Sequence, residues 1–381
     1  MAGELPSTNI PTKALVVEEV NAPFKLVDIV LDEVRSDELL IEIKYSGVCH
    51  TDLAVRNGAM AVGEYPAILG HEGAGIIRRV GSAVQNKNLK EGQNVLLSFH
   101  TCRKCVHCQA GKLGNCPEMT PSNFAGTRLS DGTAPARLID GRPARGQFFG
   151  QSSFSNLSIV PEECVIPCDL PEESLALLAP LGCGYNTGAG TVINVLKPEK
   201  WTRLAVFGVG AVGIAALLAA KAVGVETLIA VDLVESKLDN AISFGARHTI
   251  NTSKQQNLVT ALQAIGVDQI IDTTGVSSLI EMGIKALNHA GTFALVGLPR
   301  PEAPIQIDPL ETMLACKTIT GVIEGRSDPL TFLPRLIELF KEGKFPVDKL
   351  GKIYPATSIE DALRDLKRGL VVKPILSWAD I

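Results

Sequence analysis

The chain has 381 residues, of which 20% are charged, and its formal net charge is −5. This length exceeds the size at which one hydrophobic core usually stops growing, so two domains are expected. The acidic balance and the aromatic content of 5% argue against a nucleic acid or an anionic membrane surface as a partner. We expect a small neutral or weakly polar molecule instead.

The first hundred residues predict a strand-rich domain. They contain short apolar or alternating runs such as LLIEIKYSGV and QNVLLSF, which glycine, proline and acidic residues interrupt. The opening MAGELPSTNIPTK has no basic segment followed by an apolar one and a small-residue cleavage site. We therefore expect a cytoplasmic protein with reduced cysteines.

Four cysteines are closely spaced in the pattern C-x2-C-x2-C-x7-C, at Cys102, Cys105, Cys108 and Cys116. Four thiolates can complete a tetrahedral shell around one zinc ion, which leaves no position for a substrate. Two disulfides are the alternative, but nine cysteines are an odd number and a reducing compartment disfavours disulfides. The pattern therefore predicts a structural zinc site.

From about Thr202 the chain alternates between strand and helix patterns. The predicted strands are RLAVFG, TLIAVD, QIIDTTG and TFALVG, and the predicted helices are AVGIAALLAAKAVG, ESKLDNAISFG and SLIEMGIKALNHAG. Such alternation predicts a parallel, doubly wound sheet. The apolar run over 204–220 divides into a strand, a glycine turn and a helix, so it does not predict a membrane span.

A G-x-G-x-x-G turn joins the first of these strands to the first helix. Gly208 permits a tight turn, Gly210 lets the backbone approach a pyrophosphate, and Gly213 lets helix and strand touch. Ala211 and Val212 stand between the last two glycines, where the helix N-terminus faces the anion.

Asp232 ends the next predicted strand, TLIAVD. A carboxylate there can hydrogen-bond both ribose hydroxyls and would repel a 2′-phosphate. The residue therefore favours NAD over NADP.

Two helices are predicted near the C-terminus, with the sequences LTFLPRLIELFKEG and SIEDALRDLKRG. Ser358 and Asp361 predict a capped start for the second helix. Gly369 predicts its end.

Several motifs together resemble one known family. They are GVCHTD, ILGHEGAGII, CRKCVHCQAGKLGNC, FFGQSSFSNLSIV, LGCGYNTGAG, VFGVGAVG and the segment 232–237. From about Thr12 to Trp378 the chain resembles the zinc-dependent medium-chain alcohol dehydrogenases, and most of all the aryl and benzyl alcohol dehydrogenases. The resemblance implies an α/β fold: a GroES-like, β-rich catalytic domain with both zinc sites over 1–186 and 322–381, and a Rossmann NAD-binding domain with a doubly wound parallel sheet over 187–321.

The resemblance also implies a second, catalytic zinc ion, and hence two zinc ions per chain. Its ligands would be Cys49, His71 and Cys183, and three protein ligands leave the fourth position for water or substrate. Such a zinc would stabilise the alkoxide form of an alcohol for hydride transfer to a nicotinamide, and would polarise a carbonyl in the reverse direction.

Other residues match family positions around this zinc. Thr51 matches the hydroxyl that accepts the alcohol proton. Asp52 is expected to orient His71, and Glu72 to lie close behind the metal. A solvated turn acid is the alternative for either carboxylate.

Four residues match family positions at the coenzyme. His50 and Lys373 correspond to positive groups near the pyrophosphate, Lys237 to a basic group near the adenosine ribose, and Thr187 to a nicotinamide contact. Each could instead be an exposed residue without such a role.

The chain departs from many relatives at two positions. Ala54 stands where a histidine ends the proton relay, so we expect the proton to leave Thr51 through the ribose to solvent. Ser98 stands where a bulky residue narrows the substrate site, which should admit an aromatic or branched substrate. The alternative is that Phe99, Phe124 or Phe148 refills this space.

The expected activity is reversible hydride transfer between NAD and a primary, aromatic or bulky alcohol or its aldehyde. An S-(hydroxymethyl)glutathione-type dehydrogenase is an alternative, for which Arg128, Arg137, Arg142 and Arg145 could supply basic groups at the pocket mouth. An oxidoreductase of specialised metabolism and a binding or structural protein descended from an enzyme are two more. The long connection over 116–148 implies a homodimer, joined by analogy through edge strands near 292–297.

Overall fold

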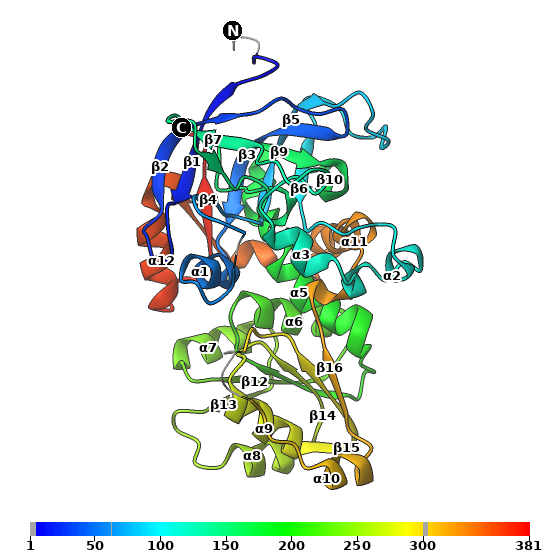
Figure 1. Cartoon of the computed structure of the whole chain (residues 1–381). Coiled ribbons are helices and arrows are strands. Elements are labelled where there is room, and N and C mark those ends of the chain that lie inside the picture. Colours follow the sequence, from blue (N-terminus) through cyan, green and yellow to red (C-terminus); the bar gives the residue numbers. More distant parts are fainter. Residues whose placement is uncertain (1–4, 62, 300–303) are drawn as a thin grey trace. The chain divides into compact units, whose positions relative to one another are not determined.

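The computed structural model of the protein describes residues 5–61, 63–299 and 304–381, and Figure 1 traces the whole chain. The chain divides into two compact units. Unit 1 comprises 1–183, 329–334 and 348–381, and unit 2 comprises 184–328 and 335–347. The limits that the sequence indicates between a catalytic and an NAD-binding domain, at 186/187 and 321/322, remain a prediction.

Unit 1 consists mainly of two β-sheets (Figure 1). The five-stranded sheet has the order β4-β1-β2-β7-β8. The seven-stranded sheet has the order β10-β6-β5-β3-β18-β17, with β9 paired to β3. The strands are β1 (Ile10–Val17), β2 (Lys25–Leu31), β3 (Glu38–Gly47), β4 (Ala67–Ile68), β5 (Gly73–Val80), β6 (Asn94–Leu97), β7 (Ala136–Leu138), β8 (Pro143–Ala144), β9 (Leu157–Pro161), β10 (Val165–Pro167), β17 (Gly351–Pro355) and β18 (Lys373–Ser377). The predicted strand-rich character of this region is confirmed.

Short helices connect these strands. They are α1 (His50–Arg56), α2 (Val106–Gln109), α3 (Met119–Phe124), α4 (Glu172–Leu178) and α12 (Ile359–Lys367). Gly369 ends α12 as predicted, with φ of 69° and its N–H donated to the carbonyl of Leu366. The predicted cap by Ser358 is wrong: a 3₁₀ turn precedes the helix, and the Ser358 side chain makes no capping hydrogen bond.

Unit 2 contains one six-stranded parallel sheet with the order β13-β12-β11-β14-β15-β16. This is the strand order of a dinucleotide-binding fold, in which the chain winds outward from the centre in both directions. The strands are β11 (Arg203–Phe207), β12 (Thr227–Asp232), β13 (His248–Asn251), β14 (Val267–Asp272), β15 (Leu287–Leu295) and β16 (Thr318–Gly321). The predicted doubly wound sheet is confirmed.

Among the described residues, four helices pack on the parallel sheet: α6 (Ala211–Ala222), α7 (Glu235–Ser243), α8 (Leu258–Ile265) and α9 (Ser277–Ala286). Unit 2 also contains α5 (Gly184–Gly190), which packs on α6, and α10 (Pro309–Leu314), while α11 (Pro329–Lys341) begins in unit 1 and continues in unit 2. Apolar side chains of α8 and α9 pack with Phe207, Val231 and Phe293 on one face. Leu204 and Val206 point to the opposite face because side chains alternate along a strand, and both are buried.

Two details of unit 2 differ from the prediction. The alternating pattern did not indicate β13 or α8. The helix expected to continue to Gly291 ends at Ala286, and the following residues belong to β15. There Leu287 pairs with Val267, and the Asn288 amide donates to Asp268 at 2.7 Å, so contacts with β14 outweigh the local helical pattern.

The segment near 292–297, which was expected to be an edge strand that joins two subunits, is not at an edge of the sheet. β15 pairs with β14 on one side and with β16 on the other, so it cannot be an edge strand. The edges of this sheet are β13 and β16. Any association through an open edge on the β15 side must therefore use β16.

The apolar run over 204–220 is divided as expected among β11, the glycine turn and α6. Among the described residues, no helix combines the length and apolar character that crossing a membrane requires.

The glycine turn generates a stability prediction. A Cβ atom on Gly213 would lie 1.9 Å from the Gly208 carbonyl oxygen, whereas a Cβ on Gly210 would meet no atom within 4 Å. We expect Gly213→Ala to lower the unfolding free energy of unit 2 by about 1–3 kcal/mol, because backbone must move to relieve the clash. Urea denaturation measures this.

Gly210→Ala is the matched control for this substitution. It should leave the urea midpoint within experimental error of the wild type. Equal midpoints for all three proteins would contradict the close contact between the helix and the turn.

Candidate metal and coenzyme sites

The four closely spaced cysteines lie together in unit 1. The Sγ atoms of Cys102, Cys105, Cys108 and Cys116 are all within 4.8 Å of one another, and none of the four forms a disulfide. The Cys102 and Cys105 sulfurs each accept a backbone N–H at 3.4 Å, from Cys105 and Cys108 respectively. With two residues between neighbouring cysteines, the sulfur of one cysteine thus contacts the backbone N–H of the next. These contacts bring the sulfurs together in the predicted cluster.

The electrostatics of this cluster suit a cation. Burial opposes ionisation of Cys102, but backbone N–H groups of Lys104 and Cys105 outweigh it and lower its pKa to about 6. Burial and the neighbouring thiols raise the pKa of Cys108 to about 12. Four sulfurs this close cannot all be anionic without a compensating positive charge, so the donor set fits one zinc ion.

A second cluster brings together residues 134 positions apart in sequence. Ligand atoms of Cys49, His71 and Cys183 lie within 4.8 Å of one another. Cys49 precedes α1, His71 follows β4, and Cys183 follows a short 3₁₀ turn over Ala179–Gly182. All three residues belong to unit 1.

The imidazole of His71 is oriented toward this cluster. It is fully buried, and its Nδ1 lies 3.0 Å from Asp52 Oδ1. Its Nε2 is buried without a hydrogen-bond partner. An unsatisfied buried nitrogen beside two sulfurs is costly in a protein without metal, and it is the geometry of a histidine ligand.

Asp52 connects the segments that carry the first two ligands. It is fully buried, and its carboxylate accepts hydrogen bonds from the backbone N–H groups of Cys49 and Gly70, each at 3.0 Å. Together with the contact to His71, this places three polar groups around one carboxylate. The expected contact between Asp52 and His71 is confirmed, and the alternative of a solvated turn acid is excluded.

The charges of the cluster shift two pKa values. A hydrogen bond from Cys183 and the positive charge of His71 lower the pKa of Cys49 well below its ordinary value, against the effect of burial. Burial disfavours protonated His71, but the negative charges of Asp52 and Cys49 outweigh it and raise its pKa. The Cys49 thiolate is therefore favoured, as metal ligation requires.

Glu72 and Lys373 form a buried ion pair behind the cluster. Lys373 Nζ donates to both carboxylate oxygens of Glu72, at 2.8 and 2.9 Å, and to the carbonyl of Val48 at 3.2 Å. Burial raises the pKa of Glu72, although Lys373 opposes this shift. The expectation that Glu72 lies close behind the metal ligands fits this position. Lys373 is only 3% exposed, so the alternative of a surface residue is wrong for it.

Thr51 and His50 lie in the first turn of α1. Thr51 Oγ1 is 3.7 Å from Cys49 Sγ, which places the hydroxyl next to the cluster. The His50 side chain is exposed. Ala54, one turn further along, is half-buried and has no group that could carry a proton.

Aromatic rings surround His71. The ring of Phe149 stacks on the imidazole with a centroid distance of 4.5 Å, and Phe148 meets it edge-on at 5.4 Å. Phe124 contacts both phenylalanines. Phe149, which the sequence interpretation missed, adopts a positive φ of 52°, and this uncommon backbone conformation aims its ring at His71. The pair of phenylalanines followed by glycine, Phe148-Phe149-Gly150, was the sequence signal that could have identified Phe149.

The Ser98 side chain contacts backbone. Ser98 is fully buried, and its hydroxyl donates to the Gly182 carbonyl at 2.6 Å. Phe148 contacts the His71 ring, and Phe124 contacts Phe148. The expectation that Ser98 leaves space for a bulky substrate and the alternative that a phenylalanine refills it both stay predictions.

The glycine turn of unit 2 has the expected geometry. Gly208 has a φ of 81°, and a Cβ there would lie 2.5 Å from Thr273 Oγ1. Gly210 precedes α6 and faces open space, while Ala211 and Val212 form the first turn of the helix. Backbone N–H groups at this helix end can bind a phosphate.

Asp232 approaches the same turn from β12. Its carboxylate accepts the N–H groups of Val209 at 2.9 Å, Leu233 at 2.8 Å and Val234 at 3.0 Å. The predicted ribose-binding carboxylate is thus held beside the predicted pyrophosphate turn.

The other two candidate coenzyme residues also lie in unit 2. Lys237 is half-buried on α7. The Thr187 hydroxyl on α5 lies 3.3 Å from Glu324 Oε2. Glu324 belongs to a turn in which it and its next two residues all have positive φ, a conformation that needs support from its surroundings.

The arginines proposed for a glutathione site are engaged elsewhere. Arg128 is buried and bonds Glu38 and Asp32, at 2.7 and 2.9 Å. The remaining three contact surface partners: Arg137 bonds Asn9, Arg142 bonds Asp140 and Glu18, and Arg145 bonds Glu64. Arg128 is therefore neutralised by two carboxylates, which argues against it as a basic group for a glutathione adduct.

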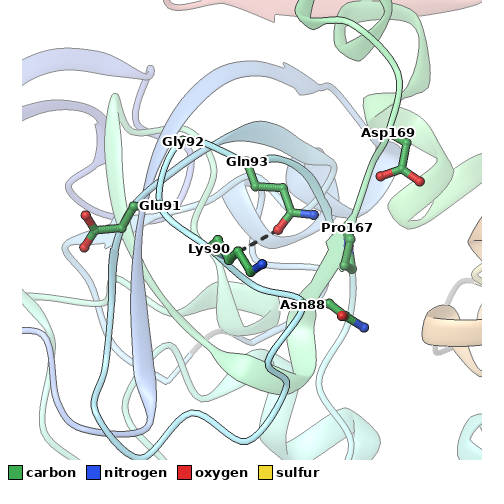
Figure 2. A pocket seen from close by; sticks show the side chains of 7 residues that line it. All are labelled: Asn88, Lys90, Glu91, Gly92, Gln93, Pro167 and Asp169. Atoms are coloured by element: carbon green, nitrogen blue, oxygen red, sulfur yellow. Dashed lines mark hydrogen bonds between the residues drawn. The ribbon is translucent and has the colours of Figure 1, made fainter.

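Two hollows lie elsewhere on unit 1. Figure 2 shows the first, lined by Asn88, Lys90, Glu91, Gly92, Gln93, Pro167 and Asp169. The second includes Arg128, His100 and Glu163. Neither is lined by a candidate metal ligand, so neither corresponds to the sites described above.

The chain is similar to known proteins over nearly its full length. Residues 35–171 match the family described as alcohol dehydrogenase GroES-like domain, and residues 211–342 match that described as zinc-binding dehydrogenase. Geraniol dehydrogenase of Castellaniella defragrans is 37% identical, covering 96% of this chain and 98% of the relative. S-(hydroxymethyl)glutathione dehydrogenase of Paracoccus denitrificans is 30% identical, covering 92% of this chain and 94% of the relative.

Two solved structures resemble this chain closely. Benzyl alcohol dehydrogenase from Acinetobacter calcoaceticus is 38% identical with a TM-score of 0.91, covering 97% of this chain and 99% of that chain. An alcohol dehydrogenase zinc-binding domain protein from Burkholderia ambifaria is 39% identical with a TM-score of 0.91, covering 96% and 98% respectively.

The buried ion pair generates a second prediction. Lys373→Met removes the cation and leaves the Glu72 carboxylate buried, so we expect the unfolding free energy of unit 1 to fall by about 3–5 kcal/mol. Urea denaturation measures the loss, followed by tryptophan fluorescence in a Trp201→Phe background that leaves Trp378 of unit 1 as the only tryptophan.

The double variant Glu72→Gln/Lys373→Met is the control for this substitution. Because it removes both charges, it should recover most of the lost stability. If the single and double variants are equally unstable, the loss comes from packing and the ion pair is not its source.

Proposed function

Because the chain belongs to the zinc-dependent medium-chain alcohol dehydrogenases, we propose that Cys49, His71 and Cys183 hold a catalytic zinc ion. The four-cysteine cluster is proposed to hold a second, structural zinc. The observation that carries this assignment is the unpartnered Nε2 of His71, buried beside two cysteine sulfurs and oriented by Asp52. When bound, the catalytic zinc supplies a Lewis acid that favours the alkoxide form of an alcohol and polarises an aldehyde carbonyl.

The surrounding residues have separate tasks in this proposal. Asp52 accepts a hydrogen bond from His71 Nδ1–H, and with the proton held on Nδ1 the Nε2 lone pair is available as a ligand. The rings of Phe148 and Phe149 exclude water from the imidazole. Thr51, whose Oγ1 lies 3.7 Å from Cys49 Sγ, is proposed to accept the alcohol proton. Since Ala54 has no group that could relay that proton, it would have to leave Thr51 by another route.

NAD is the proposed coenzyme. The glycine turn and the first turn of α6 bind its pyrophosphate, and Asp232 binds its ribose hydroxyls. The negative charge of Asp232 disfavours a 2′-phosphate at this position. Lys237, Thr187 and His50 are proposed as further contacts to the coenzyme.

The proposed substrate is a primary alcohol whose aldehyde is conjugated, such as an aromatic or allylic alcohol. The support is the similarity to geraniol dehydrogenase and benzyl alcohol dehydrogenase, at 37% and 38% identity. Both of the alcohols they are named for carry the hydroxyl on a carbon next to an sp² carbon. The engagement of the four arginines with other residues gives less support to a glutathione adduct.

A substrate panel tests this function. NADH formation with purified enzyme should show a kcat/KM at least about tenfold higher for benzyl alcohol than for cyclohexylmethanol, which has a similar size but no conjugation. Geraniol should likewise exceed its analogue citronellol. NADP in place of NAD should lower kcat/KM for every alcohol.

Two outcomes of this panel would overturn the assignment. S-(hydroxymethyl)glutathione as the best substrate would favour the alternative branch of the family. Equal rates for the conjugated and saturated partners would show that size alone determines selection.

A homodimer through β16 is also proposed. In α10, which precedes this edge strand in the chain, no residue is buried, and Leu310, Met313 and Leu314 are each more than half exposed. Exposed apolar side chains next to an open strand edge are typical of a subunit interface. A second copy of the chain would cover them and extend the sheet.

Size measurement by light scattering tests this interface. The double variant Met313→Lys/Leu314→Lys should be monomeric, because it places charges in the proposed apolar contact. Trp201→Lys, on another exposed apolar residue of unit 2, should remain dimeric. A wild-type protein that is monomeric, or a double variant that remains dimeric, would contradict the proposed interface.

A further inference from the structure

Gln151 lies fully buried directly behind His71. Its side-chain Oε1 accepts the backbone N–H of Gly73 at 2.9 Å. Its Nε2 donates to the carbonyl of His71 at 3.0 Å and to the carbonyl of Ser98 at 3.3 Å. One side chain therefore satisfies three buried backbone groups, one of which belongs to a proposed zinc ligand.

These three backbone groups lie where a strand ladder ends. The pairing of β5 with β6 stops at Ala74 opposite Leu96. Beyond that pair the two strands separate. The segment before β5 leads to His71, and the segment after β6 leads to Ser98. The carboxamide of Gln151 bridges them in place of a further backbone pair, because it offers the same donor and acceptor groups as a peptide bond.

The segment around Gln151 supports the same stretch of backbone. The Ser152 hydroxyl donates to the Ile68 carbonyl at 2.7 Å, and the Ser153 N–H donates to the Gly70 carbonyl at 2.9 Å. Just before Gln151, the Phe149 ring stacks on the His71 imidazole. The chain over 148–153 thus contacts the backbone and the ring of His71 together.

The residue type is well suited to this task. A glutamate at 151 would keep the acceptor for Gly73 but, when ionised, would place oxygen against two carbonyls. An apolar side chain of equal length would leave all three backbone groups unpaired, at a cost for each.

We propose that Gln151 is a positioning residue for His71: it fixes the main chain of this ligand while Asp52 fixes its ring. The proposal rests on the proposed function, since it takes His71 to be a ligand of the catalytic zinc. Without the carboxamide, the His71 carbonyl and the Gly73 N–H lose their common partner. The Nε2 atom of His71 is then no longer fixed relative to the sulfurs of Cys49 and Cys183.

Zinc release to a chromogenic chelator tests the proposal without depending on enzyme turnover. Wild-type protein should release two zinc ions per chain in two phases. The phase absent from a His71→Ala variant is assigned to the Cys49–His71–Cys183 site. In Gln151→Met this phase should be about tenfold faster or more, as found for other residues that orient metal ligands, while the phase of the four-cysteine site should be unchanged.

Gln147→Met is the matched control. Gln147 is also a buried glutamine of the same segment, but its amide lies 3.4 Å from Glu38 Oε1 and the Ile159 carbonyl and does not contact His71. Its release phases should match those of the wild type. Cobalt-substituted proteins give a second readout: the visible d–d bands of the catalytic site should shift in Gln151→Met and remain unchanged in Gln147→Met.

The outcomes separate the two proposals. If wild-type protein holds one zinc and His71→Ala does not change its release, the proposed function fails. If two zinc ions are present and the Gln151 and Gln147 variants release zinc at the same rates, only the role of Gln151 fails. Should Gln151→Met not fold, Gln151→Glu takes its place, with faster catalytic-site release expected and unchanged release contradicting the proposal.

Discussion

The carboxylate of Asp52 is the constraint on which the candidate catalytic site depends. It binds the N–H groups of Cys49 and Gly70 and the Nδ1 of His71, all at 3.0 Å. These groups come from the start of α1 and from the segment before β5, so a single buried carboxylate brings two ligand-bearing segments together. Its position at the third residue of α1 also allows it to bond the N–H at the helix start, as in a capping box.

The charges around this carboxylate are mostly negative. Asp52 and Glu72 are buried carboxylates, the Cys49 thiolate is half-buried, and Lys373 contributes a buried positive charge that is held by Glu72. Lys373 also acts electrostatically on the Cys49 and Cys183 thiols. A divalent cation between two thiolates and a neutral imidazole would offset most of the remaining negative charge, which explains why the donor set suits zinc.

The two units divide the chemistry between them. Unit 1 contains the sulfur and imidazole donors, and unit 2 contains the glycine turn and Asp232. In each unit, the candidate ligand-binding groups are held by hydrogen bonds to other groups: Asp52 and Gln151 hold His71, and the N–H of Val209 holds Asp232.

The sequence by itself determined the features that depend on local spacing. The C-x2-C-x2-C-x7-C pattern, the glycine turn with Asp232, and the alternation of strands and helices in unit 2 all follow from which side chains lie a few residues apart. The Asp52 contact was accessible because the residue lies three positions after Cys49 and the family motif indicated its partner. Hydrophobic periodicity could likewise place most strands of the parallel sheet.

Only the tertiary structure decided the features that depend on distant segments. The lengths of α9 and β15 were set by pairing with β14 and by the contact between Asn288 and Asp268, which overrode the local helical pattern. The environments of Lys373 and Arg128 depended on carboxylates 301 and 90 positions away. Gln151 reaches the carbonyl of His71 across 80 positions, and no local pattern reports which backbone groups remain unpaired at the end of a strand ladder.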